Sequence, residues 1–234
     1  MQTKIHGKSR LKVPAAMADN LHLWMELLAK ANQGISINLI VTRRPSRVCW
    51  SDLCPFGIGG YSLVPGLSWR IRIPRISIIY GSNRVNNLLE FLGMAINILL
   101  EINDCKRGDQ DCILALGDNM AAVGWLHNTA KLGPGEGARK SHLMVARKIA
   151  QQVLDHGCCM ASQHIKGELN NVADLLSFAG SLTRAGGKMH PLAADDPPND
   201  ILTQRFHSAY PEQIPANFAI SQLPDEILSW ASRV

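Results

Sequence analysis

The chain has 234 residues, of which 46% are hydrophobic and 18% are charged, and this composition excludes a disordered protein. Its longest apolar run is interrupted by Glu90, Gly93 and Asn97, and its basic N-terminus lacks the apolar segment of a signal peptide, so we expect no membrane span and an intracellular protein of the cytoplasm or nucleus. The formal net charge of +5 is uneven, because residues 1–50 carry eight Lys and Arg against two acids, which suits either a polyanionic partner or a merely soluble basic surface.

The first predicted element is an amphipathic helix over 15–31. Leu21, Trp24 and Leu28 lie on one face of this helix, and Gly34 follows its end. A short apolar strand or connector over 35–41 comes next. We expect residues 1–44 to form an N-terminal helix and connector that packs beside the unit that follows.

Three strands are predicted next, as an antiparallel meander. The first runs through Val48 to Trp50 and stops where Asp52 stands, and Pro55 and Gly57 mark the turn. The second and third strands cover 59–63 and 67–74. This order holds the carboxylate of Asp52 at an edge of the sheet.

A long amphipathic helix over 83–103 and a short apolar strand over 111–117 follow the meander. Glu90 lies off the apolar stripe of that helix, and a solvated surface position is the simplest interpretation of it when it is considered alone. Asp118 directly follows the strand, and a helix N-cap is the simplest interpretation of it when it is considered alone.

The last predicted elements of the main unit are a helix over 140–156, a strand over 158–165 and a short helix over 170–177 that carries Asp174. Strands and helices in this order predict a mixed α/β sheet with helices on its faces, over 45–180. A linker rich in Gly, Pro and Asp covers 181–200, and a tail with a short helix from Pro224 covers 201–234.

The six cysteines contain no C-x-x-C pair. A zinc site or a disulfide framework is therefore not expected, and reduced core thiols are. They stand at positions 49, 54, 105, 112, 158 and 159.

Five segments together resemble a known domain: SDLCPFGIGGYS, WRIRIP, NNLLEFLGM, LGDNMAAVGWL and HIKGELNNVADLLS. On these segments, residues 20–178 resemble the ribonuclease H domain of retrotransposon reverse transcriptases, in particular that of DIRS-type elements, without the polymerase or recombinase domains. The resemblance implies a ribonuclease H-like mixed sheet, with a three-strand antiparallel meander plus parallel strands. It also implies that the family's four metal-binding, catalytic carboxylates are Asp52, Glu90, Asp118 and Asp174, and it gives His164 a weaker claim to a catalytic role.

The function implied by the resemblance is an endonuclease that hydrolyses the RNA strand of RNA–DNA hybrids with two Mg²⁺ or Mn²⁺ ions. Arg43, Arg44 and Arg47 are candidate nucleic-acid contacts, and other retroelement proteins are candidate partners. Two alternatives stay open: a catalytically silent nucleic-acid-binding or assembly module, and a related nuclease that cuts DNA. Leu53 and Phe178 depart from the residues usual in the family at those positions.

Overall fold

The computed structural model describes residues 14–34, 43–54, 57–64, 66–73, 83–105, 111–127, 136–177, 198–209, 211–212 and 216–234. The chain divides into two compact units, residues 1–37 and 38–234. The predicted connector over 35–41, the turn at Pro55 and most of the predicted linker over 181–200 lie outside the described residues.

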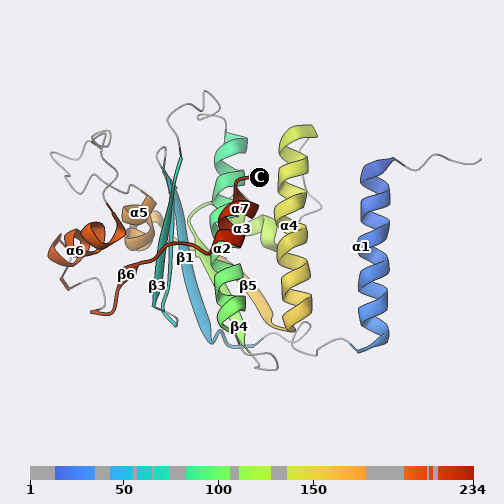
Figure 1. Cartoon of the computed structure of the whole chain (residues 1–234), viewed down its shortest axis with the longest axis horizontal. Coiled ribbons are helices and arrows are strands. Elements are labelled where there is room, and N and C mark those ends of the chain that lie inside the picture. Colours follow the sequence, from blue (N-terminus) through green and yellow to red (C-terminus); the bar gives the residue numbers. More distant parts are fainter. Residues whose placement is uncertain are drawn as a thin grey trace, which may run out of the picture. The chain divides into compact units, whose positions relative to one another are not determined.

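The first unit contains one described helix, α1 (Ala15–Asn32) (Figure 1). It begins after Pro14, and Gly34 beyond its end has a φ of 100°, a conformation that favours glycine. The predicted helix is therefore confirmed. Leu21, Trp24 and Leu28, which the sequence places on one face, are exposed.

The second unit is built on a six-stranded sheet with the strand order β5-β4-β1-β2-β3-β6. Strands β1, β2 and β3 pair antiparallel, whereas β4 pairs parallel with both β1 and β5, and β6 pairs parallel with β3. The predicted ribonuclease H-like mixed sheet is therefore confirmed by its strand order and directions. The strands are β1 (Arg47–Cys54), β2 (Gly57–Ser62), β3 (Leu67–Arg72), β4 (Cys112–Gly117), β5 (Cys159–His164) and β6 (Ala219–Ile220).

Four features of this unit differ from the prediction, and one of them is the 11-residue helix α6 (Asn199–Ala209), which lies where the end of a linker and the start of a tail were predicted. Strand β1 continues through Asp52, because pairing with β2 runs on to the Cys54–Gly57 pair, so the acid lies within the strand and not after it. Helix α4 (Glu136–His156) begins earlier than predicted, inside a glycine-rich segment whose low helix propensity argued for a loop. The tail adds the sixth strand, β6, which has only two residues and no alternating pattern to reveal it.

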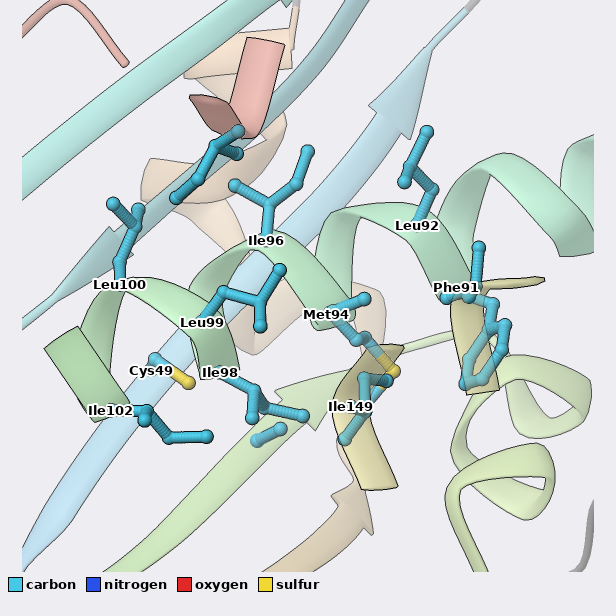
Figure 2. Packing of buried hydrophobic residues seen from close by; sticks show 14 of the residues in the cluster. Cys49, Phe91, Leu92, Met94, Ile96, Ile98, Leu99, Leu100, Ile102 and Ile149 are labelled. Atoms are coloured by element: carbon cyan, nitrogen blue, oxygen red, sulfur yellow. The ribbon is translucent and has the colours of Figure 1, made fainter. Parts of the chain in front are cut away.

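Helix α2 (Asn83–Asp104) is the centre of the main core. It lies between the sheet and α4, and Figure 2 shows its side chains Ile98 and Ile102 beside Cys49 of β1. By length and composition α2 could cross a membrane, but 78% of the apolar window is buried within the fold. Its apolar character is therefore that of a core helix.

The two faces of the sheet are covered differently. Helices α2, α4 and α7 (Asp225–Ala231) lie on one side, and α5 (Asn171–Ser177) and α6 (Asn199–Ala209) lie on the other (Figure 1). Ile227 and Trp230 of α7 join the main core, so the tail is an integral part of this unit. A smaller core under α5 and α6 consists of Leu176, Leu202, Phe206, Phe218 and Ile220.

None of the six cysteines forms a disulfide, as predicted. Four of them, Cys49, Cys54, Cys112 and Cys158, are buried. They act as small apolar side chains of the interior.

Candidate metal centre

Three carboxylates meet at one end of the sheet. Asp52, Glu90 and Asp118 each offer a carboxylate oxygen, and these atoms all lie within 4.8 Å of one another. Among the described residues no other group of three or more His, Cys, Asp or Glu side chains is as close. We call these three residues the carboxylate cluster.

The parallel pairing of β1 with β4 brings two of the acids together. Their pairing ends at Trp50 and Leu116, Asp52 lies two residues farther along β1, and Asp118 directly follows β4. The carboxyl ends of neighbouring parallel strands lie at the same edge of a sheet, where ligand sites of α/β proteins commonly form. The site is therefore a direct result of the topology.

Glu90 reaches the cluster from the first half of α2. The helix approaches the sheet closely at Gly93, where a Cβ atom would lie 2.9 Å from Ile58 Cγ2 and 3.3 Å from Ser51 Cβ. The close approach buries Glu90, which is only 8% exposed. The interpretation of Glu90 as a solvated helix position is thereby excluded.

The carboxylate of Asp118 is not used as the helix cap that the sequence suggested. The next residue, Asn119, caps α3 (Met120–His127), since its Oδ1 accepts the N–H groups of Ala121 and Ala122 at 3.0 Å each. The Asn119 Nδ2 group also donates to Asn87 Oδ1 of α2, at 2.9 Å. Asp118 therefore contributes its carboxylate to the cluster and not to the end of the helix.

The segment after β5 runs beside Asp118. The His164 ring Nε2 lies 2.9 Å from the backbone carbonyl oxygen of Asp118, and the Ile165 N–H donates to Gly117 O. At Gly167, in the short 3₁₀ helix Gly167–Leu169, an added Cβ would lie 3.0 Å from Asp118 Oδ2. His164 therefore lies next to the carboxylate cluster, and its ring nitrogen contacts the backbone oxygen of Asp118.

The fourth predicted acid, Asp174, lies in the first turn of α5 and outside the group of three. Its negative charge nevertheless contributes to raising the pKa of Asp52. The structure therefore brings three of the four predicted acids together and places the fourth within electrostatic reach of them.

The cluster is unfavourable for negative charge when no cation is bound. Burial, followed by the charges of Asp118 and Asp174, raises the pKa of Asp52 to about 8. Burial, followed by the charges of Asp52 and Asp118, raises the pKa of Glu90 to about 9, although the backbone N–H of Leu53 acts in the opposite direction. At neutral pH, Asp52 and Glu90 therefore favour their protonated, uncharged forms unless a cation compensates their negative charge.

The donor set fits a hard divalent cation. Mg²⁺ prefers oxygen ligands and is usually held by a few carboxylates together with water. Asp52, Glu90 and Asp118 provide such oxygens from three different parts of the chain, and these oxygens lie within 4.8 Å of one another. These three residues would hold the ion.

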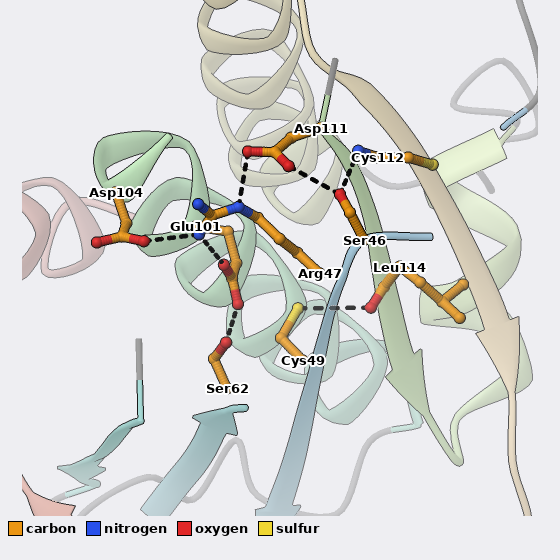
Figure 3. A network of polar contacts seen from close by, with 9 residues as sticks. All are labelled: Ser46, Arg47, Cys49, Ser62, Glu101, Asp104, Asp111, Cys112 and Leu114. Carbon is orange, nitrogen blue, oxygen red and sulfur yellow. Dashed lines mark hydrogen bonds and ion pairs between the residues drawn. The ribbon is translucent and has the colours of Figure 1, made fainter. Parts of the chain in front are cut away.

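Of the three arginines predicted to contact nucleic acid, Arg47 lies in the interior. Its guanidinium donates to Asp104 at 2.7 Å, Asp111 at 2.9 Å and Glu101 at 3.1 Å (Figure 3). Ser46 also binds Asp111, and Ser62 binds Glu101. Arg47 therefore joins the start of β1 to α2 and to the residue before β4, and because its side chain is buried against three carboxylates it is poorly placed to bind phosphate.

The other two arginines lie nearer the surface. Arg44 is exposed, and Arg43 is partly buried, with its backbone carbonyl accepting a hydrogen bond from the Cys112 thiol. Arg44 therefore remains the clearest candidate for a phosphate contact among the three.

The sequence analysis did not identify two residues that touch Asp52. The amide of Asn170 and the hydroxyl of Ser177 donate to the two oxygens of this carboxylate, at 3.3 and 3.4 Å. Both residues lie close to Asp174 in the sequence. The Asn at the start of the predicted helix over 170–177 could have indicated a contact with the site, but a helix cap explains an Asn at that position equally well.

Comparison with known proteins identifies no family for the chain. No protein-family model and no curated protein matches the chain. Among solved structures, LC11-RNase H1 in complex with an RNA/DNA hybrid is 15% identical, with a TM-score of 0.43, over 56% of this chain and 93% of that one. RNase H1 from the halophilic archaeon Halobacterium salinarum NRC-1 is 14% identical, with a TM-score of 0.40, over 56% of this chain and 92% of that one. The assignment of the fold rests on the topology of the sheet described above.

Proposed function

We propose that the chain is a divalent-metal-dependent endonuclease that hydrolyses the RNA strand of RNA–DNA hybrids. The observation that carries the proposal is the convergence of Asp52, Glu90 and Asp118 at one end of a ribonuclease H-like sheet. The order of these acids along the chain, and the motifs around them, resemble those of retrotransposon ribonuclease H domains. On the same resemblance we propose an origin in a DIRS-type retroelement and a location in the cytoplasm or nucleus.

The four acids would hold two ions between them in this proposal. Asp52, the most buried of the carboxylate cluster, would serve both ions, Glu90 and Asp118 would hold the first and Asp174 would hold the second. When bound, two Mg²⁺ or Mn²⁺ ions supply an activated water and stabilise the leaving oxygen of the phosphodiester. Selection of an RNA strand depends on contacts to its 2′-hydroxyl groups.

The second candidate function is a catalytically silent module that binds nucleic acid or takes part in an assembly. The departures from the family pattern at Leu53 and Phe178 favour it. It uses the same fold and the same basic surface but requires no metal ion. The two functions therefore differ in what divalent ions do to the protein.

A cleavage assay tests the proposal. With Mg²⁺ or Mn²⁺ the purified chain is expected to cut the RNA strand of a labelled hybrid. Asp118→Asn is expected to abolish cutting without unfolding the protein, because the amide keeps the shape of the carboxylate but lacks the charge that holds the ion. Asp225→Asn, which changes an exposed acid of α7, serves as the matched control and should leave cutting unchanged.

Two results would contradict the proposal. Wild-type protein that binds the hybrid but cuts it with neither metal is a silent module. Wild-type protein that cuts duplex DNA and leaves the hybrid intact is a DNA nuclease.

A further inference from the structure

We propose that Asn170 is a positioning residue that orients the Asp52 carboxylate for metal binding, an inference that rests on the metal centre of the proposed function. Asn170 is 1% exposed and lies between the 3₁₀ helix and α5. Its Nδ2 group donates to the backbone oxygen of Ser51 at 2.9 Å and to Asp52 Oδ1 at 3.3 Å. One amide therefore holds both the backbone and the side chain next to the cluster.

The contact to Ser51 occurs where β1 loses its pairing with β4. The last pair of β1 with β4 is Trp50 with Leu116, and Ser51 is the next residue of β1. The Asn170 amide donates to the Ser51 carbonyl oxygen at this point. Beyond the last β4 pair, the end of β1 that carries Asp52 is therefore held by β2 and by a side chain from the segment before α5.

The backbone of Asn170 extends the connection to the fourth acid. Its carbonyl oxygen accepts the N–H of Asp174 at 3.0 Å, which closes the first turn of α5. At the other end of the helix, Ser177 Oγ lies 2.8 Å from Asp174 O and 3.4 Å from Asp52 Oδ2. Asn170 thus sets the position of the helix turn that carries Asp174 relative to the Asp52 carboxylate.

The remaining atom of the amide indicates that Asn170 is not present for stability alone. Its Oδ1 is buried and has no hydrogen-bond donor among the residues that the structure describes. A buried acceptor without a donor costs about 1–3 kcal/mol. Rotating the amide would place this oxygen against two other oxygens, Ser51 O and Asp52 Oδ1, so the orientation is set by the contacts to β1.

The consequence is a carboxylate with a defined orientation. Asp52 lies within 4.8 Å of the Glu90 and Asp118 carboxylates, and the Asn170 amide on Oδ1 restricts the rotation of its carboxylate. Residues that orient metal ligands in this way typically change metal affinity about 10- to 100-fold when they are removed. Asn170 is expected to do the same for Asp52.

The test is a Mn²⁺ titration of the full chain, with free Mn²⁺ followed by electron paramagnetic resonance to obtain a Kd. Asn170→Ala is expected to raise the Kd about 10- to 100-fold. Asn171→Ala is the matched control, because it removes the same side chain from the next, exposed position, and its Kd should equal that of the wild type. In hybrid cleavage, measured well below the metal-free melting temperature of both proteins, Asn170→Ala should lower kcat at low Mn²⁺ and approach the wild-type kcat when Mn²⁺ is in excess. A smaller fraction of folded protein would instead lower the rate at every Mn²⁺ concentration.

Each outcome decides something. If the wild type binds Mn²⁺ and Asn170→Ala binds it equally well, the positioning role is wrong while the metal centre stands. If the wild type binds no Mn²⁺, both the proposed metal centre and the positioning role are wrong. If Asn170→Ala does not fold, Asn170→Ser decides, because it keeps a small polar side chain that is too short for both contacts: a wild-type Kd overturns the proposal and a Kd raised at least about 10-fold supports it.

Discussion

Asp52 lies in surroundings that disfavour its charge, and this is the physical basis for a metal centre at the end of β1. It is 6% exposed and has two other acids within 4.8 Å. The donors Asn170 and Ser177 contact its two oxygens only at 3.3 and 3.4 Å, which are long distances for hydrogen bonds. Such strain is common where function and stability conflict, because the residue is retained for what it binds.

The first prediction at the residue scale is that Asp52→Asn melts at a higher temperature than the wild type at pH 7 without metal. The pKa of Asp52 is raised to about 8, so the folded state must keep a proton there that the unfolded state has released above its normal pKa of 3.8. Metal-free stability is therefore expected to fall as the pH rises from about 5 to about 8. The asparagine needs no proton and removes this cost.

Millimolar Mg²⁺ or Mn²⁺ gives the complementary result in the same thermal-shift series. An ion that binds only the folded state stabilises it by mass action, so the wild type should melt higher with metal. Asp52→Asn should lose most of that gain. A wild type that does not respond to metal, together with a neutral or destabilising Asp52→Asn, would show that Asp52 has only a structural role.

The second residue-scale prediction concerns His142, which is buried in the core away from the carboxylate cluster. Its ring lies 4.8 Å from that of Phe91 and 4.1 Å from that of Trp125, centroid to centroid, and its Nε2 has no partner within the described structure. Burial lowers its pKa from 6.5 to about 4. The folded state therefore requires a neutral imidazole.

As the pH falls from about 6.5 towards 4, the unfolded chain takes up a proton at His142 and the folded chain does not, so stability is lost in this window. His142→Leu should reduce the fall in melting temperature between pH 7 and pH 5, measured with Mg²⁺ present to suppress the titration of the cluster. His22→Gln, at an exposed position of α1, is the control and should leave the fall unchanged. An equal fall in His142→Leu would assign the pH dependence to other groups.

At the scale of elements, the glycines of β2 let helices pack on both faces of one strand. A Cβ at Gly59 would lie 2.5 Å from Leu176 Cβ of α5, whereas a Cβ at Gly60 would lie 2.6 Å from the Trp69 ring and 2.9 Å from Asn97 Nδ2 of α2. Neighbouring residues of a strand face opposite sides of the sheet, so the two glycines serve opposite layers. The close approach of α5 places Asn170, Asp174 and Ser177 near Asp52.

We therefore predict that Gly59→Ala destabilises the protein by about 1–3 kcal/mol, as overpacked cores do, and also weakens Mn²⁺ binding because α5 must move. Gly124→Ala in α3 is the matched control. Nothing lies within 4 Å of a Cβ there, so it should stabilise the helix by about 0.5–1 kcal/mol. Urea unfolding measures the change in stability, and Mn²⁺ titration measures the change in affinity. If Gly59→Ala binds Mn²⁺ as tightly as the wild type, the position of α5 does not affect the metal centre.

At the scale of the whole molecule, neighbouring arginines differ in where they lie, in the interior or on the surface. Arg47 is surrounded by Glu101, Asp104 and Asp111 and contributes to the fold. Arg44 is exposed and is available to a polyanion. Arg47 therefore stabilises the fold, whereas Arg44 is available to bind phosphate.

The whole-molecule prediction is that Arg44→Ala weakens hybrid binding and reduces the slope of log affinity against log salt by about 0.9, the value expected for one lost phosphate contact. Arg205→Ala, an exposed change in α6, should leave the slope unchanged. Arg47→Ala should instead lower the free energy of unfolding by about 3–5 kcal/mol, because it leaves the buried carboxylate of Glu101 without its positively charged partner. Fluorescence anisotropy at several salt concentrations measures the slope, and urea unfolding measures the change in stability. An unchanged slope in Arg44→Ala would show that Arg44 is a solvent-exposed charge that does not contact the nucleic acid.

The sequence alone determined the order and type of most elements of the main unit, because apolar periodicity is local. The meander, α2, β4, β5 and α5 follow from it, and so does the order in which Asp52, Glu90, Asp118 and Asp174 occur. The strand β6 was missed because two residues carry no periodic pattern. The start of α4 was missed because its glycines have low intrinsic helix propensity.

Only the tertiary structure decided what individual side chains touch. Asp118 had the local signal of a cap and Glu90 that of a surface residue, but Asn119 takes the cap and Gly93 allows α2 to bury the glutamate. The donor to Asp52 comes from Asn170, 118 positions away in the chain, and Arg47 meets carboxylates 54 to 64 positions away. Contacts at such separations depend on how the sheet closes and how closely each helix approaches it, and no local pattern of residues contains that information.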